Sequence, residues 1–391
     1  MIVSYRFLNP YTFQSGVTVS NRVVVPPMTE SMSFSDGAVT TDELHYFRIH
    51  SRGVGMYITP VANVNALGKG FEGELSVADD HCIPDLARVA QQIHANGTKA
   101  VLQIFSAGRM TNSAILRGQQ PVSASAVAAL RPDAETPRAL TDAEVRATIA
   151  DFGAATRRAI KAGFDGVELH GANTYLLQQF FSPHSNRRTD DWGGTLEKRM
   201  AFPLAVIAAA QAAIHEDAQN PFLLGYRFSP EEIEKPGIRI EDTLQLLAKL
   251  DTLNLDYLHM SMGNAWRTSL NNHNDPEPLL NKVLVVTHQT PLISVGGIET
   301  PEQADKVMAA GATFVALGRE NLREPNWVQK VSNHTETTIR YKLAVTDLEE
   351  LGIPESFFRY LANMERHGAN IGFEPSLAKA SEDEALNVIF N

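Results

Sequence analysis

The feature that most limits how this chain can fold is a series of eight short apolar runs, most of them followed by a loop and a helical pattern. The runs span residues 23–25, 56–58, 100–102, 166–169, 222–224, 257–260, 292–295 and 314–317. They are continuously apolar rather than alternating, as strands buried on both faces require. Alternation of strand and helix indicates a parallel sheet, and eight such units predict an α/β fold that closes into a single (β/α)8 TIM barrel.

Two additions to the barrel are expected. Residues 9–20 hold Gly16 between short apolar pieces, which predicts an N-terminal β-hairpin closing the bottom of the barrel. Residues 356–365 have the pattern of an amphipathic helix. We therefore predict a barrel over residues 1–335 and a C-terminal extension, residues 336–391, packed on or near it. A single barrel fits a chain of 391 residues that is 43% hydrophobic.

The seventh unit carries the clearest helix signals. Thr300 is placed to cap a helix that begins at Pro301, because proline favours the first helical position. Gly311 is placed to end that helix before the eighth run.

Charge and hydropathy exclude several classes of partner. The formal net charge is −11 and no basic run occurs, which argues against nucleic-acid binding. No apolar stretch approaches the roughly 20 residues that span a bilayer. Residues 1–10 lack the basic and apolar segments of a signal peptide. We predict a cytoplasmic protein with a small-molecule substrate; the sequence is compatible with a homo-oligomer and does not specify one.

The single cysteine, Cys82, excludes an internal disulfide, a cysteine-rich zinc site and a cysteine-ligated iron–sulfur cluster. We interpret it as a buried or half-buried thiol and predict no metal site.

Glycines follow the last two strands, where TIM barrels often bind phosphate. Gly296 and Gly297 end the seventh run, and Gly318 with Arg319 ends the eighth. Glycine lets backbone N–H groups approach an anion closely, and an arginine offers a fork for phosphate oxygens. Glycine in either turn could be a steric requirement only, but both turns together with an arginine favour a phosphate site.

The fourth strand is followed by three polar residues within six positions. His170 and Asn173 can form a neutral donor pair that binds a carbonyl oxygen, and Tyr175 is a weak acid able to deliver a proton beside it. Helical spacing would not place 170 and 175 on one face, so a strand end and an irregular turn must bring them together. Each alone could be structural: a core histidine, a turn asparagine, a packed tyrosine.

Several motifs in order resemble the Old Yellow Enzyme family of flavin-dependent ene-reductases, over about residues 5–330. They are residues 21–29, 103–109, 163–199, Arg227, 296–298 and 316–319. The resemblance implies a single (β/α)8 barrel that holds non-covalent FMN and uses NAD(P)H as reductant. It also implies ping-pong kinetics, with both substrates visiting one face of the flavin.

The resemblance assigns a role to each matched residue. Gln103 would bind the pyrimidine edge of the flavin, and Arg227 would lie near N1 and O2, where its charge raises the reduction potential. The remaining cofactor contacts would come from His170, from the two glycine turns, and from Pro26, Pro27, Met28, Thr29 and Val61.

On the substrate side, His170 and Asn173 would bind the carbonyl oxygen of an α,β-unsaturated compound, and Tyr175 would protonate the α-carbon. Enones, maleimides and nitro compounds are the implied substrates.

The chain departs from the family pattern at Thr29, Asn173, Pro60 and Ser106, which leaves substrate range and loop geometry open. Residues 68–73 fit G-x-G-x-x-G but open no helix, so we interpret them as a loop. Two other functions stay open: a flavin-free barrel lyase or isomerase acting on a phosphorylated substrate, and a non-catalytic flavin carrier.

Overall fold

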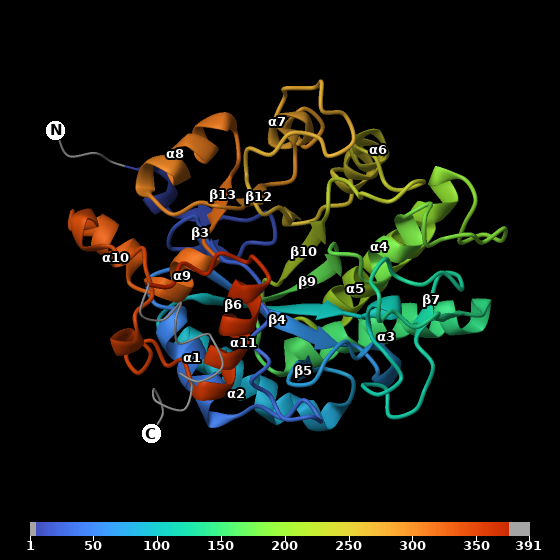
Figure 1. Ribbon diagram of the computed structural model, residues 1–391, viewed down its shortest axis with the longest axis horizontal. Helices are drawn as coiled ribbons and strands as arrows, with labels where there is room; N and C mark the ends of the chain where they lie inside the picture. Colours follow the sequence, from blue (N-terminus) through green and yellow to red (C-terminus); the bar gives the residue numbers. More distant parts are fainter. Residues whose placement is uncertain (1–4, 375–391) are drawn as a thin grey trace.

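The computed structural model describes residues 5–374, and all eight predicted strands lie in one closed barrel (Figure 1). Each strand pairs in parallel with its neighbours, and β3 pairs with both β13 and β4, which closes the ring. The α/β TIM-barrel prediction is confirmed. In ring order the strands are β3 (Val23–Val25), β4 (Met56–Asn63), β6 (Lys99–Phe105), β9 (Gly166–Gly171), β10 (Leu223–Phe228), β11 (Tyr257–Met260), β12 (Leu292–Val295) and β13 (Phe314–Ala316).

Two strands run beyond their apolar runs. We predicted residues 56–58 as the second strand, but β4 continues to Asn63 and includes Pro60. The register with β6 shifts between Ile58 and Val61, and such a bulge tolerates a proline that a regular ladder would not. β6 likewise continues beyond the predicted run 100–102 to Phe105, so Gln103 lies inside the strand.

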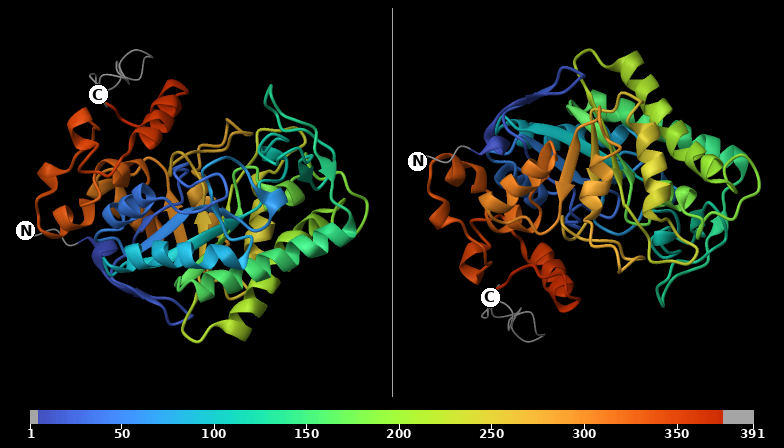
Figure 2. Two further views of the ribbon diagram at one scale, coloured as in Figure 1. Left: turned by 90° about the horizontal axis from the view of Figure 1, so that it is seen from below. Right: turned by 90° about the horizontal axis from the view of Figure 1, so that it is seen from above.

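Helices surround the barrel (Figures 1 and 2). The longest, α3 and α5, pack against each other outside β9. Thr141 and Glu144 form a capping box at the start of α3, and Thr300 and Gln303 form one at the start of α8. The helices are α1 (Thr41–His50), α2 (Ile83–His94), α3 (Asp142–Lys161), α4 (Leu176–Phe181), α5 (Leu196–Asp217), α6 (Ile240–Leu250), α7 (Leu279–Leu284), α8 (Pro301–Ala310), α9 (Arg319–Arg323), α10 (Trp327–Ser332) and α11 (Glu355–Arg366).

The predicted hairpin closes the N-terminal end of the barrel. β1 (Tyr11–Thr12) and β2 (Thr18–Val19) pair antiparallel, and Phe13 between them stacks on Phe314 at 5.1 Å between ring centres. Phe13 belongs to the same apolar cluster as Met56 and Leu223 inside the barrel. Side chains therefore fill the interior of the barrel at this end. Short strands β5 (Leu75–Ser76), β7 (Val122–Ser123) and β8 (Arg138–Ala139) lie in the loops.

The C-terminal segment packs on the side of the barrel. Phe357 and Phe358 of α11 share an apolar cluster with Tyr46 of α1 and Leu322 of α9. Figure 1 shows α11 near α1 and α9. The predicted amphipathic helix is confirmed. The division of the chain at residue 335 stays a prediction, and residues 375–391 of the predicted extension lie outside the described residues, as do residues 1–4 of the N-terminal segment.

Within residues 5–374, none of the helices combines the length and apolar character of a membrane span. The cytoplasmic location and the homo-oligomer stay predictions. Cys82 is a buried free thiol, in agreement with its interpretation from the sequence.

Replacing Thr300 by alanine removes the cap of α8, because its hydroxyl accepts the Gln303 backbone N–H. We expect the free energy of unfolding in urea to fall by about 1 kcal/mol. Thr18→Ala, at an exposed position of the hairpin, is the control and should cost less than about 0.5 kcal/mol. Equal losses in the two variants would contradict the capping role.

Candidate active site at the open end of the barrel

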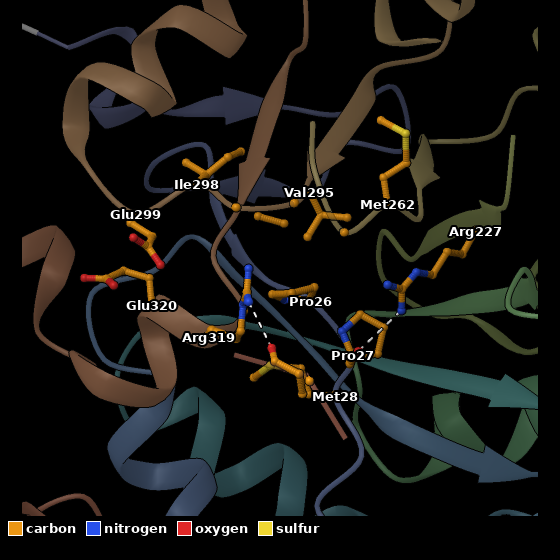
Figure 3. A pocket seen from close by; sticks show the side chains of 17 residues that line it. Pro26, Pro27, Met28, Arg227, Met262, Val295, Ile298, Glu299, Arg319 and Glu320 are labelled. Carbon is orange, nitrogen blue, oxygen red and sulfur yellow. Dashed lines mark hydrogen bonds between the residues drawn. The ribbon is translucent and has the colours of Figure 1, made fainter. Parts of the chain in front are cut away.

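A cavity of about 440 Å³ opens at the C-terminal ends of β3, β12 and β13 (Figure 3). It is lined by backbone-rich turns together with a few charged side chains. Eight of the predicted cofactor residues lie around it: Pro26, Pro27, Met28, Arg227, Gly296, Gly297, Gly318 and Arg319. The turns that the sequence indicated as a phosphate site are thus brought to one place by strand closure.

The glycines of these turns are required by their surroundings. Gly296 and Gly297 have φ of 128° and 63°, which other residues rarely adopt. A Cβ at Gly296 would lie 2.6 Å from the backbone nitrogen of Asn264. A Cβ at Gly318 would lie 3.2 Å from the Met28 sulfur, on the wall of the cavity. The cavity therefore depends on the absence of side chains at its phosphate end.

Arg319 supplies a positive charge at the end of the cavity that the glycine turns form. Its Nη1 donates to the carbonyls of Ala369 and Asn370, each at 3.0 Å, so the segment after α11 holds it in place. The two acids on the same wall, Glu299 and Glu320, are each 2.7 Å from Arg323. Arg323 thus offsets their charge and leaves Arg319 available to an anion.

The other predicted residues lie beside this cavity, toward β4, β6 and β9. Val61 packs with Phe105 and Ala107, and Tyr175 packs against that cluster. The rings of His170 and Tyr175 meet edge to face with 5.0 Å between centres. Arg227 is opposite His170 in the sheet and also lines the cavity, so it connects the two halves of the site. In Figure 3 its guanidinium points to the Pro27 carbonyl, at 3.4 Å.

His170 is a neutral hydrogen-bond donor. The backbone N–H of Ala172 donates to its Nδ1 at 3.3 Å, so the ring hydrogen is on Nε2. Burial, and then the positive charge of Arg227, lower the pKa of His170 well below its usual value. The ring is therefore uncharged at neutral pH and presents one N–H.

Tyr175 is a protonated phenol. Burial, followed by the repulsion of nearby Glu74, raises the pKa of Tyr175 to about 12. Its ring is held by Phe105, edge to face at 4.9 Å between centres. A phenol with this pKa keeps its proton until a stronger base forms beside it.

The turn that joins these two residues is strained. Asn173 and Thr174 have φ of 56° and 65°, a region that β-branched threonine in particular disfavours. Gln179 holds the turn by donating to the Thr174 carbonyl at 2.7 Å. The Asn173 side-chain oxygen accepts from Ser261 at 2.9 Å, which leaves its NH2 group to donate elsewhere. Asn173 is exposed, and its joint action with His170 on one oxygen stays a prediction.

Unpartnered atoms show what the site can bind. Among the described residues, buried Gln103 Oε1 and Arg227 Nε have no hydrogen-bond partner. One is an acceptor and the other a donor, and buried polar groups normally have partners. The pyrimidine edge of a flavin offers both complementary groups, and the glycine turns leave room for its phosphate. The residues present therefore fit FMN.

Three residues near the site received no role from the sequence. Glu168 and His259 are polar residues inside continuously buried strands, a signal that was available in the sequence. Tyr360 of α11 hydrogen-bonds Thr29. Burial raises the pKa of Tyr360, and the hydrogen bond to Thr29 lowers it by a smaller amount. No local pattern indicates that contact, because residues 29 and 360 meet only through packing of the C-terminal segment.

The fold and the site define a flavin-binding TIM-barrel oxidoreductase. A family model described as the NADH:flavin oxidoreductase / NADH oxidase family matches residues 6–338. The chain belongs to this family, which confirms the resemblance drawn from the sequence, with FMN as cofactor and NAD(P)H as reductant.

Individual relatives agree with the family. The chain is 45% identical to the NADH:acrylate oxidoreductase of Vibrio harveyi over 92% of its own length and 36% of that protein. It is 44% identical to the probable NADH-dependent flavin oxidoreductase YqiG of Bacillus subtilis, over 90% and 95% of the two lengths. The Old Yellow Enzyme homologue from Zymomonas mobilis shares the fold, with a TM-score of 0.75 at 23% identity, over 90% of this chain and 98% of that one. The chain thus spans about a third of the length of the first of these proteins.

Replacing Gly318 by valine should remove bound flavin without unfolding the barrel. The new methyl groups would project into the cavity between Met28 and Pro26. We expect the purified variant to lack flavin absorbance while keeping the far-ultraviolet circular dichroism of the parent. Gly153→Ala, in helix α3 with only ordinary contacts around the new carbon, is the control and should keep its flavin. A yellow Gly318→Val protein would show that FMN binds elsewhere.

Proposed function

We propose that this flavin oxidoreductase reduces the activated C=C bond of α,β-unsaturated carbonyl compounds such as enones and maleimides, and also acts on nitro compounds. The observation that carries the proposal is a neutral imidazole N–H beside a protonated phenol, next to the flavin-binding residues. When bound, FMN supplies hydride chemistry: it takes a hydride from NAD(P)H and passes it to the β-carbon of the alkene.

His170 and Asn173 bind and polarise the substrate carbonyl. The His170 Nε2–H and the free Asn173 NH2 donate to the oxygen, where negative charge accumulates during the reaction. Donors aimed at that oxygen bind the transition state more tightly than the ground state. Because His170 is already neutral, it donates a hydrogen bond without transferring a proton.

Tyr175 supplies the proton to the α-carbon. Its pKa of about 12 keeps the phenol protonated in the resting enzyme, and an enolate-like carbon is basic enough to accept from it. The ring contacts with His170 and Phe105 hold the hydroxyl beside the carbonyl site.

Arg227 stabilises the negative charge of the reduced flavin. It is buried next to His170 and lines the cavity, so its positive charge acts in a low-dielectric environment. Gln103 Oε1 and Arg227 Nε are the unpartnered atoms that we assign to the pyrimidine edge of the flavin. Thr29 and Val61 complete the wall around the ring.

The name of one relative supports this substrate class. The Vibrio harveyi protein is named as an acrylate oxidoreductase, and acrylate is an alkene conjugated to a carboxylate. Because the chain spans 36% of that protein, acrylate itself is a candidate here rather than an assigned substrate.

Colour distinguishes the rival functions. We expect the FMN-loaded protein to be yellow, to be bleached by NADH or NADPH without oxygen, and to recover its colour on addition of an enone. A protein that stays colourless with FMN would favour a flavin-free lyase or isomerase. A yellow protein that neither nucleotide bleaches would favour a flavin carrier. Intersecting double-reciprocal plots would contradict the ping-pong order.

The double variant His170→Ala, Asn173→Ala should keep FMN but reduce enones more slowly. Removing one donor from such a site costs about 10²–10³ in rate, so the pair should cost at least this much. The measurement is the rate of flavin reoxidation by an enone in stopped flow. His215→Ala, in α5 near the opposite end of the barrel, is the matched control and should behave as the parent. An unchanged rate in the double variant would refute the carbonyl-binding role.

Tyr175→Phe should slow reoxidation by the enone while leaving reduction by NAD(P)H close to that of the parent. In the parent, the reoxidation rate should be independent of pH up to about pH 11, one unit below the tyrosine pKa of about 12. Tyr226→Phe, another buried tyrosine on β10, is the control. Equal slowing of both half-reactions in Tyr175→Phe would argue against proton donation.

A further inference from the structure

A buried carboxylate lies inside the barrel directly below the proposed flavin residues. Glu168 is on β9, two positions before His170, so the two side chains point to the same side of the sheet. Its side chain is fully buried, while the layer of the barrel nearer the hairpin is apolar, with Val101, Leu223 and Ile293. A charge in that position is costly unless its partners hold it.

Glu168 accepts from one close partner on each oxygen, and the hydroxyl of the buried Tyr257 also interacts with it. Gln103 Nε2 donates to Oε1 at 2.6 Å, and His259 Nδ1 lies 2.9 Å from Oε2. Both partners are fully buried. They come from β6 on one side of β9 and from β11 across β10, so the carboxylate joins strands that are not neighbours in the sheet.

These contacts fix the chemistry of the partners. A carboxylate only accepts hydrogen bonds, so the amide NH2 of Gln103 must face it and Oε1 must face away. For the same reason the His259 hydrogen is on Nδ1. Burial lowers the pKa of His259, against the opposing effect of Glu168, so the ring is neutral and Nε2 is a bare acceptor.

Both acceptor atoms are left without a partner among the described residues. Gln103 Oε1 and His259 Nε2 are buried and unbonded. An unsatisfied buried acceptor costs about 1–3 kcal/mol, so a ligand that brought donors to both atoms would recover that cost. The arrangement therefore points to a ligand that brings N–H or O–H donors.

Arg227 ties this network to the cofactor cavity. It stands opposite His259 on β11 and opposite His170 on β9, and it lines the cavity. Burial lowers the pKa of Arg227, whereas the charge of Glu168 raises it, so the two charges act on each other inside the barrel. A ligand group that Arg227 stabilises in the cavity is therefore also subject to the negative charge of Glu168.

We propose that Glu168 is a positioning residue of the flavin site: it turns Gln103 and His259 so that each presents a bare acceptor to FMN, and its negative charge moderates Arg227 and lowers the reduction potential of the flavin. The inference rests on the proposed function, because it assigns the donors to FMN bound at this end of the barrel. FMN supplies such donors at the ring N3–H and at the ribityl hydroxyls.

The test replaces Glu168 by glutamine in the full chain. Glu168→Gln keeps the shape but removes the charge and supplies only one acceptor for two donors. We expect the dissociation constant of FMN for the apoprotein to rise about tenfold. We expect the midpoint potential of bound FMN to shift to a more positive value, measured by equilibration with a reference dye.

Asp256→Asn is the matched control. Asp256 is a buried carboxylate just before β11, at the hairpin end, where it accepts from the backbone N–H groups of Ser15 and Leu224. Its loss removes the same charge from the same barrel, so it should affect stability without changing the potential or the affinity for FMN. Equal potential shifts in Asp256→Asn and Glu168→Gln would overturn the proposal.

A second variant decides the question if Glu168→Gln does not fold. Glu168→Asp keeps the charge but withdraws both acceptors by one methylene, so FMN should bind more weakly at a nearly unchanged potential. Parental values of both quantities in either Glu168 variant would refute the positioning role. If the proposed function were wrong, the result would differ from these outcomes: the parent protein itself would not bind FMN, or NAD(P)H would not bleach it.

Discussion

Closure of the ring by β3, which pairs with both β4 and β13, is the constraint on which the rest of the structure depends. It brings residues that are distant in the sequence to one open end, since all eight strands point the same way. Phe13 of the hairpin helps to fill the interior of the barrel at the other end. An apolar layer inside the barrel then supports a polar one, in which Gln103, Glu168 and Arg227 are buried under the cavity.

The open end divides into two regions with different physical requirements. The region that we assign to the flavin phosphate is made of glycine turns and Arg319, and it is kept open by the absence of side chains. The ring region is made of strand side chains whose protonation is set by burial, as for His170 and Tyr175. Arg227 belongs to both regions. The C-terminal segment contributes at two points, through the carbonyls that hold Arg319 and through Tyr360 beside Thr29.

Most of the fold could be predicted from the sequence because strands buried on both faces are continuously apolar. The end of β4 was placed too early, because no local pattern indicates that a bulge between Ile58 and Val61 accommodates Pro60. The end of β6 was placed too early because the polar Gln103 interrupts its apolar run. That the two glycine turns lie at one cavity was predictable from their places after the last two strands, while their binding of phosphate stays a prediction. Glu168 and His259 received no role, because a polar residue in a strand shows its partners only when neighbouring strands are in register. The contact of Tyr360 depends on tertiary packing alone.

The central claim is that one flavin lies across this open end, with its phosphate at the glycine turns and its ring beside His170. A crystal structure of the FMN-loaded protein tests it most directly. The account predicts density for the phosphate between Gly297 and Arg319, and for the pyrimidine edge within hydrogen-bond distance of Gln103 Oε1 and Arg227. A flavin bound elsewhere, or a cavity filled by side chains in the loaded protein, would contradict it.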